Sequence, residues 1–154
     1  MKHSSRSASG ALRRWFFSLL LGCLLPCCAQ ASELLTFDGL YKSNTVLGLK
    51  FADRTLALKG QTVRLRGYMA PPLKPESNFF VLTREPVAIC PFCSSDAEWP
   101  VDIVVVYADK TVIPTNFSIR IEVEGTLEVG SFIDPRTGFV SQLRLRDSIF
   151  HKIN

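Results

Sequence analysis

The sequence has little histidine and no apolar run long enough to cross a bilayer. Only two of its 154 residues are histidines, His3 and His151, and no serine or acidic pattern points to a hydrolytic triad with either. The apolar run Trp15 to Leu25 has about 11 residues, whereas a spanning helix needs roughly 20. No segment has a helical period longer than about two turns. These absences argue against a Ser–His hydrolase, a retained transmembrane helix and an α/β layer.

Charge is balanced once the N-terminal segment is set aside. The chain carries 18 Lys and Arg against 14 Asp and Glu. Lys2, Arg6, Arg13 and Arg14 precede Ser32 and no acidic residue does, which leaves 14 basic residues against 14 acidic ones. A neutral body has no net field to attract a polyanion. We therefore expect no nucleic-acid partner.

Residues 1–31 have the pattern of an export signal. A basic start ends at Arg13-Arg14, an apolar run follows, and Ala29-Gln30-Ala31 supplies a small-x-small cleavage site. We predict cleavage between Ala31 and Ser32, which leaves residues 32–154 as a single β-barrel domain. Its expected location is the periplasm.

Two variants of this leader would change the route or the location. Leu20-Leu21-Gly22-Cys23 resembles a lipoprotein signal, and acylation of Cys23 would anchor the protein to a membrane, although Leu21 fits the cleavage point poorly. Arg13 to Phe17 resembles a twin-arginine signal without its usual flanking Ser and Lys, and would mean export in the folded state. Ordinary secretion is the default, and membrane association is expected only if Cys23 is lipidated.

The mature segment is patterned as β-strands. Alternating or continuous apolar residues predict five strands, at Gln61–Ala70, Asn78–Thr83, Asp102–Tyr107, Phe117–Val129 and Phe139–Phe150. The third is continuously apolar, so we expect it at the centre of the sheet with both faces covered. Gly67 in the first indicates a bend or bulge. The fold class predicted is mostly all-β, a small five-stranded Greek-key barrel of the OB type, with a small β-sandwich as the alternative.

Charged residues alternate with the apolar ones in the first, fourth and fifth of these strands. The outer face would carry both signs, at Arg64, Arg66, Glu122, Glu124, Glu128, Arg144 and Arg146. The arginines could serve a single-stranded nucleic acid. Since the glutamates share their face, cross-strand charge pairing on a solvated surface is the simpler explanation.

Cys90 and Cys93 are the only cysteines after residue 31, and they fall in the loop Ile89 to Pro100 between the second and third strands. In an oxidising compartment one interpretation is a disulfide that staples the loop. A second is a metal contact, with zinc as the candidate ion. A structural zinc wants four ligands, so a second chain or further residues would complete the site. The candidate residues for this are Asp96, Glu98 and His151.

A third interpretation of the same loop is thiol–disulfide exchange. Cys-Pro-x-Cys resembles the active-site spacing of thioredoxin-like oxidoreductases. Those sites belong to an α/β fold, and a mostly β chain lacks that context. Cys90 and Cys93 are therefore candidates for a disulfide or for metal binding before they are candidates for catalysis.

Three stretches carry a resemblance to a known family: Gly67-Tyr68-Met69-Ala70-Pro71, Phe79-Phe80-Val81-Leu82 and Cys90-Pro91-Phe92-Cys93. From Leu56 to Tyr107 the chain resembles a family of uncharacterised bacterial periplasmic proteins, some of them lipoproteins. The resemblance implies an accessory role near ABC transporters of the macrolide-export type, in settings linked to zinc homeostasis. It implies no catalytic residues. We therefore expect an exported accessory or binding protein, with a periplasmic thiol–disulfide oxidoreductase as the alternative.

Overall fold

The computed structural model describes residues 31–45, 48–71, 78–88 and 99–153, which are mostly β-strand. The strands are β1 (Glu33–Leu35), β2 (Tyr41–Thr45), β3 (Gly48–Phe51), β4 (Thr62–Met69), β5 (Phe79–Thr83), β6 (Ile103–Ala108), β7 (Arg120–Ile133) and β8 (Val140–Lys152). A 3-10 turn, η1 (Phe37–Gly39), and a short helix, α1 (Asp53–Ala57), precede β4. Within these ranges, no helix has the length and apolar character to span a membrane.

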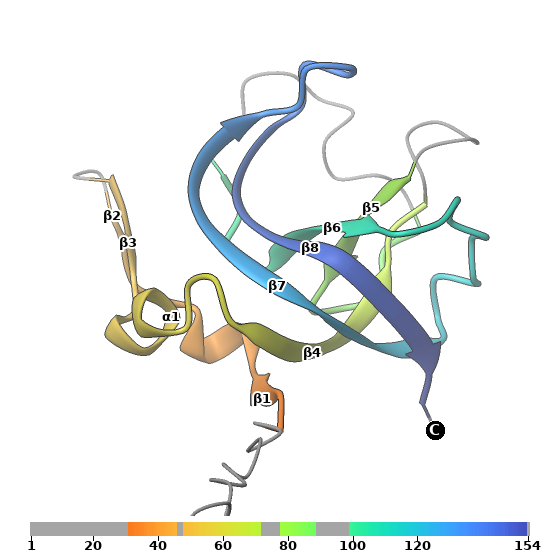
Figure 1. The fold of residues 1–154 in the computed structure, drawn as a ribbon, viewed down its shortest axis with the longest axis horizontal. Coiled ribbons are helices and arrows are strands. Elements are labelled where there is room, and N and C mark those ends of the chain that lie inside the picture. Colours follow the sequence, from red (N-terminus) through yellow and green to blue (C-terminus); the bar gives the residue numbers. More distant parts are fainter. Residues whose placement is uncertain (1–30, 46–47, 72–77, 89–98, 154) are drawn as a thin grey trace, which may run out of the picture. The chain divides into compact units, whose positions relative to one another are not determined.

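Six of the strands form one mixed sheet that closes partly into a ring (Figure 1). The order is β1-β4-β5-β6-β8-β7, and β4 also pairs with β7. Strands β4 to β8 thus form the ring expected of a small Greek-key barrel of the OB type, and the predicted fold class is confirmed. The ring is incompletely closed between β4 and β5, because these strands are paired at two positions alone, Tyr68 with Thr83 and Met69 with Leu82. The sheet is therefore not strictly a barrel.

Each of the five predicted strands coincides with one strand of the ring. The sequence did not predict β1 or the separate two-stranded sheet of β2 and β3, because the segment Ser32 to Lys50 has no clean period. β1 runs parallel to β4, with Leu35 opposite Leu65. The β2–β3 hairpin is attached at its base, where Tyr41 and Phe51 pack against the core with ring centroids 5.3 Å apart.

Strand β6 is buried on both faces, as its continuous apolar sequence predicted. Val104 and Val106 belong to the main core inside the ring. On the other face Val105 and Tyr107 form a second layer with Phe79. Phe132, Phe139 and Trp99 pack over that layer. The curved β7–β8 hairpin in Figure 1 brings the first two of these rings onto β6.

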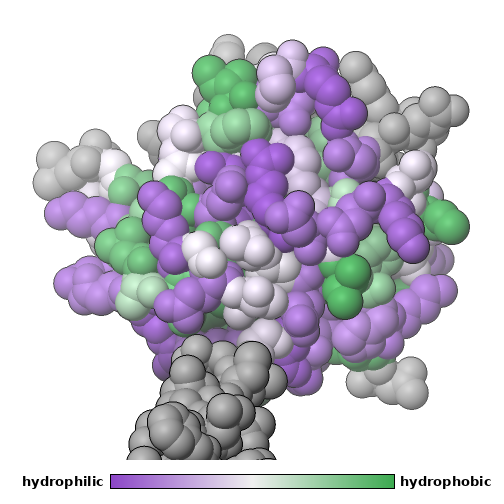
Figure 2. Space-filling view, viewed as in Figure 1, coloured by the Kyte–Doolittle hydropathy of each residue, from purple (hydrophilic) through white to green (hydrophobic). Residues whose placement is uncertain are grey.

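The outer charges of the β7–β8 hairpin pair across the strands. Glu128 accepts hydrogen bonds from Arg144 at 2.6 Å and Arg146 at 3.1 Å. The Arg146 guanidinium also lies 3.9 Å from the ring centroid of Tyr107 and 4.5 Å from that of Phe132, a cation–π geometry. Figure 2 shows polar side chains gathered over this part of the surface. The expected cross-strand charge pairing is confirmed here.

Gly67 lies where β5 crosses close to β4. The register between β4 and β7 runs unbroken from Thr62 to Tyr68, so there is no bulge at this glycine. A Cβ at Gly67 would lie 2.5 Å from the carbonyl oxygen of Thr83 and 3.1 Å from Cγ of Leu82. A side chain of any size would push β5 away from β4. The glycine therefore permits the close approach that starts the β4–β5 pairing.

We expect Gly67→Ala to destabilise the fold by about 2 kcal/mol, since overpacking against backbone costs roughly 1–3 kcal/mol. Denaturant unfolding of the variant and the parent chain measures the difference. Gly39→Ala is the matched control, because its Cβ would meet Oγ1 of Thr36 at an ordinary 3.4 Å. Equal stability of the two alanine variants would contradict the close approach.

Candidate functional site

Most of the cysteine-loop residues predicted from the sequence lie outside the described residues. They are Cys90, Cys93, Asp96 and Glu98, and the possible lipidation site Cys23 lies outside them as well. Among the residues that the structure does describe, no three His, Cys, Asp or Glu side chains come together to hold a metal ion. The disulfide and zinc interpretations of the loop therefore stay predictions.

Three predicted residues fall within the described ranges. His151 is exposed on β8, opposite Glu122 of β7. Ala31 is exposed, and Ser32, the predicted first residue after cleavage, is attached to the sheet. Its hydroxyl donates to Glu124 at 2.9 Å, and its carbonyl accepts from Arg64 at 3.1 Å. The sheet thus binds the segment that follows the predicted cleavage site.

The first root of the cysteine loop is the end of β5. Thr83 is buried, and its hydroxyl donates to the carbonyl of Glu85 at 2.7 Å and lies 3.2 Å from that of Tyr68. The amide of Arg84 donates to the carbonyl of Asp102 at 3.0 Å, which joins the two roots of the loop. The chain therefore leaves β5, which ends at Thr83, in a defined direction.

The second root is Trp99, which precedes β6. Its side chain packs against all three apolar clusters of the domain, and its indole N–H donates to the Tyr41 hydroxyl at 2.8 Å. Burial raises the pKa of Tyr41 to about 12, and the negative charge of Asp102 adds to this while the Trp99 hydrogen bond opposes it. Trp99 thus packs against the core and also anchors the loop.

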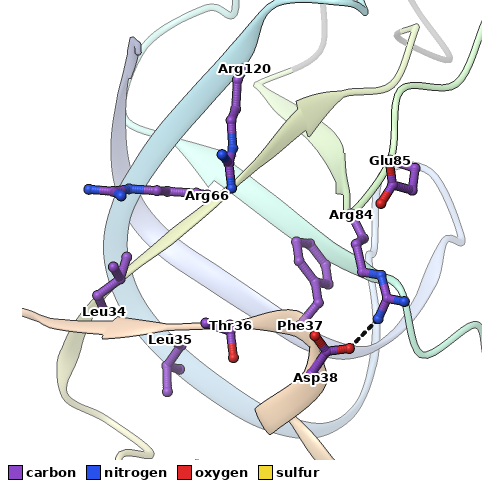
Figure 3. Close-up of a pocket in the computed structure, with 9 residues that line it drawn as sticks. All are labelled: Leu34, Leu35, Thr36, Phe37, Asp38, Arg66, Arg84, Glu85 and Arg120. Atoms are coloured by element: carbon purple, nitrogen blue, oxygen red, sulfur yellow. Dashed lines mark hydrogen bonds and ion pairs between the residues drawn. The ribbon is translucent and has the colours of Figure 1, made fainter. Parts of the chain in front are cut away.

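An arginine-lined cleft of about 480 Å³ opens beside the first root (Figure 3). Its lining comes from β1, η1, β4, the end of β5 and the start of β7, and comprises Leu34, Leu35, Thr36, Phe37, Asp38, Arg66, Arg84, Glu85 and Arg120. We call this the arginine cleft. Its volume is within the range of small-molecule sites.

The arginine cleft occupies a gap in the pairing of β4. Along one edge of β4, β1 pairs with Val63 to Leu65 and β5 pairs with Tyr68 and Met69. Between these two stretches, Arg66 and Gly67 have no residue paired with them in β1 or β5. Asp38 of η1 and Arg84 form an ion pair across the gap, drawn as a dashed line in Figure 3.

Glu122 is the counter-charge of Arg66, one of the arginines that line the cleft. Its carboxylate accepts from Arg66 at 2.6 Å and from Arg64 at 3.2 Å. The hydrogen bond from Arg66 is the main reason that the pKa of Glu122 is lowered, and burial opposes the shift. We expected Glu122 on a solvated face, which was wrong: it is 5% exposed because the two arginine side chains cover it.

Sequence analysis missed three residues of this cleft. Arg84 and Asp38 are separated by 46 positions, and no local period links them. Arg120 stands at the start of the strongly patterned β7 and reads as one more outward charge of the strand. In the structure, Arg120 lies opposite Tyr68 rather than opposite an acidic residue. The sequence does not reveal this register, so no local signal distinguishes Arg120 from the other outward charges of the strand.

The fold resembles one solved structure, and comparisons by sequence find no relative. No protein-family model matches the chain, and no curated protein matches it. The crystal structure of a DUF3299 family protein from Pseudomonas aeruginosa PAO1 superposes with a TM-score of 0.55. The match covers 80% of this chain and 97% of that protein at 18% identity. At this identity the likeness shows a shared fold.

We expect Glu122→Gln to destabilise the protein by about 1–2 kcal/mol at neutral pH, because two guanidiniums lose a buried counter-charge. The folded pKa of Glu122 is below the ordinary value of 4.5 for a glutamate. Its contribution is therefore present above that value and is lost as the pH falls through the folded pKa. Urea unfolding at neutral and acid pH should show the two proteins converging in acid.

Glu124→Gln is the control for this measurement. Glu124 is two residues along the same face of β7, and its carboxylate accepts from the Ser32 hydroxyl. We expect a smaller loss than for Glu122→Gln, since no guanidinium within the described ranges is hydrogen-bonded to it. Equal losses in both variants would argue against the buried three-residue ion cluster.

The Trp99–Tyr41 anchor predicts an alkaline loss of stability. Because the folded pKa of Tyr41 is about 12 and the ordinary value is 10.0, the phenol ionises earlier in the unfolded chain. The contribution of Tyr41 to the free energy of unfolding is therefore fully present below about pH 10 and is lost as the pH rises toward 12. Denaturant unfolding over that range should give a shallower fall for Tyr41→Phe.

Tyr107, whose pKa is also about 12, should contribute separately, so Tyr107→Phe should leave the Tyr41 component in place.

Proposed function

We propose that the protein is an exported periplasmic accessory or binding protein that acts through the end of the ring from which the cysteine loop leaves. In this proposal Cys90 and Cys93 form a disulfide or a metal contact. The partner is a component of an ABC transporter or another periplasmic protein, and the setting is metal, in particular zinc, homeostasis. Acylation of Cys23 would add a membrane anchor.

The observation that supports this proposal most directly is that both roots of the loop are held on the sheet. Trp99 is anchored in the core and on Tyr41, and the amide of Arg84 is bonded to Asp102. Loops on a rigid β-scaffold are common positions for binding sites. The arginine cleft beside the first root adds a charged hollow to the same end of the domain.

The family proposed from the sequence is consistent with the structural likeness. The GYMAP motif spans the end of β4 and Pro71, and Phe79 to Leu82 lies within β5. These two motifs thus build the close β4–β5 crossing at Gly67. We propose that a shared scaffold of this kind underlies the resemblance to periplasmic proteins and lipoproteins with a CPFC loop.

The fold favours binding over thiol–disulfide exchange. Thioredoxin-like sites place Cys-x-x-Cys at the start of a helix that follows a strand. Among the described residues, the five-residue helix α1 and the 3-10 turn η1 both come before β4, and the ring itself consists of β-strands. We therefore keep the oxidoreductase as the second candidate on the Cys-Pro-x-Cys spacing alone.

We expect the cysteines of the exported protein to be oxidised. Alkylation without reductant should leave Cys90 and Cys93 unmodified, and the intact mass should be lower by two hydrogens than after reduction. Metal analysis of the same sample distinguishes the alternatives, because a metal site requires thiolates. Stoichiometric zinc together with reduced thiols would reject the disulfide and support the metal contact.

The single variants Cys90→Ser and Cys93→Ser are the matched controls. Each should expose one alkylatable thiol without changing the unfolding of the sheet, since the staple lies outside the ring strands. Catalytic oxidation or reduction of a test dithiol by the parent chain, abolished in Cys90→Ser, would reject the accessory function in favour of the oxidoreductase.

A further inference from the structure

We propose that the arginine cleft binds a small monocarboxylate with an apolar body, and that the Arg120 guanidinium holds its carboxylate. The proposal stands on described residues of β1, η1, β4, β7 and the segment that follows β5. It does not depend on the state of Cys90 and Cys93, so it can fail or hold separately from the proposed accessory function.

Arg120 differs from the other arginines of the described domain in having no acceptor. Seven of the eight arginines in the described ranges donate to an acidic, amide or carbonyl oxygen: Arg54, Arg64, Arg66, Arg84, Arg136, Arg144 and Arg146. The Arg120 guanidinium makes no hydrogen bond or ion pair with any residue that the structure describes, and it points into the arginine cleft from β7 (Figure 3). Arg120 is an exposed residue at the start of β7, and its five N–H donors thus face the cleft and the solvent rather than a partner among the described residues.

The neighbouring charges leave a positive excess at this side of the cleft. Arg66, the next arginine of the lining, already shares the carboxylate of Glu122 with Arg64. Two guanidiniums therefore face one negative charge before Arg120 is added. Ionised oxygen acceptors make the strong, often bidentate hydrogen bonds that a guanidinium favours. A carboxylate placed beside Arg120 would balance the excess.

The rest of the lining selects a monoanion with an apolar body. Leu34 is 37% exposed, and Phe37 is buried within the floor of the cleft. A short hydrocarbon segment can cover both and remove them from water. Glu85 and Asp38 also line the cleft, and Asp38 is paired with Arg84. The negative charge of Glu85, which has no ion-pair partner among the described residues, disfavours a second carboxylate on the ligand.

The test compares an acid with its amide. Hexanoate and hexanamide are titrated into the full chain, and binding is followed by calorimetry and by the NMR signals of the arginine Nε–H groups. We expect hexanoate to bind, the Arg120 signal to move most, and hexanamide to bind at least about tenfold more weakly, as charge-assisted hydrogen bonds imply. Equal binding of the two, or no binding of hexanoate at millimolar concentration, would overturn the proposal.

Two substitutions of opposite sign sharpen this test. Arg120→Gln should weaken hexanoate binding at least about tenfold without lowering stability, because Arg120 has no partner among the described residues to lose. Glu85→Gln should strengthen binding, since it removes a repulsive charge from the lining. Arg136→Gln is the control. Arg136 is an exposed arginine in the turn before β8, and it donates to the side-chain oxygen of Asn78. Its removal should not change the affinity for hexanoate. Equal loss in Arg136→Gln and Arg120→Gln would overturn the assignment to Arg120.

A carboxylate on an apolar body can belong to a free acid or to the C-terminus of a peptide. Acetyl-alanyl-leucine with a free carboxyl group and its C-terminal amide distinguish these sources. Tighter binding of the dipeptide acid than of hexanoate, abolished in its amide, identifies a peptide terminus as the ligand. Tighter binding of hexanoate identifies a small free acid. Indifference of both compounds to Arg120→Gln would reject the cleft as a carboxylate site.

Discussion

The structure depends on the way β4 shares its two edges among three strands. One edge pairs with β7 from Thr62 to Tyr68, which joins the first and fourth strands of the ring. The other edge is divided between parallel β1 and antiparallel β5. Because β1 and β5 meet β4 at different positions, a gap remains at Arg66 and Gly67. Both the tight crossing at Gly67 and the arginine cleft follow from this division.

The same constraint explains how charges can be buried in a small β-domain. Pairing β4 with β7 places Glu122 directly beside the arginines of β4, which neutralise and cover it. At the other end of the hairpin, Glu128 likewise pairs with two arginines, but here Arg144 is the buried partner and Glu128 is 40% exposed. Among the described residues, four arginines and two glutamates are thus held in cross-strand ion pairs, and Arg120 is the one described arginine without an acceptor among the described residues.

Much of the fold could be predicted because its information is local. The continuous apolar run Ile103 to Tyr107 predicted a strand covered on both faces, and the alternation from Ile121 to Val129 predicted which residues of β7 face the core. β1 could not be predicted because its three residues become a strand only by pairing with the distant β4, and the β2–β3 hairpin could not because its short segments have no regular apolar alternation. The cleft was missed for the same reason.

The sequence by itself determined the five strands of the ring, the charge balance of residues 32–154 and the candidate thiol pair Cys90 and Cys93, since each depends on residue type and spacing along one stretch of chain. Only the tertiary structure decided which charges have partners. Whether Asp38 meets Arg84, whether Glu122 is buried and whether Arg120 is left without an acceptor depend on β4 bringing together segments far apart in the sequence. Electrostatic interactions act through space, and a period of two along a strand carries no information about them.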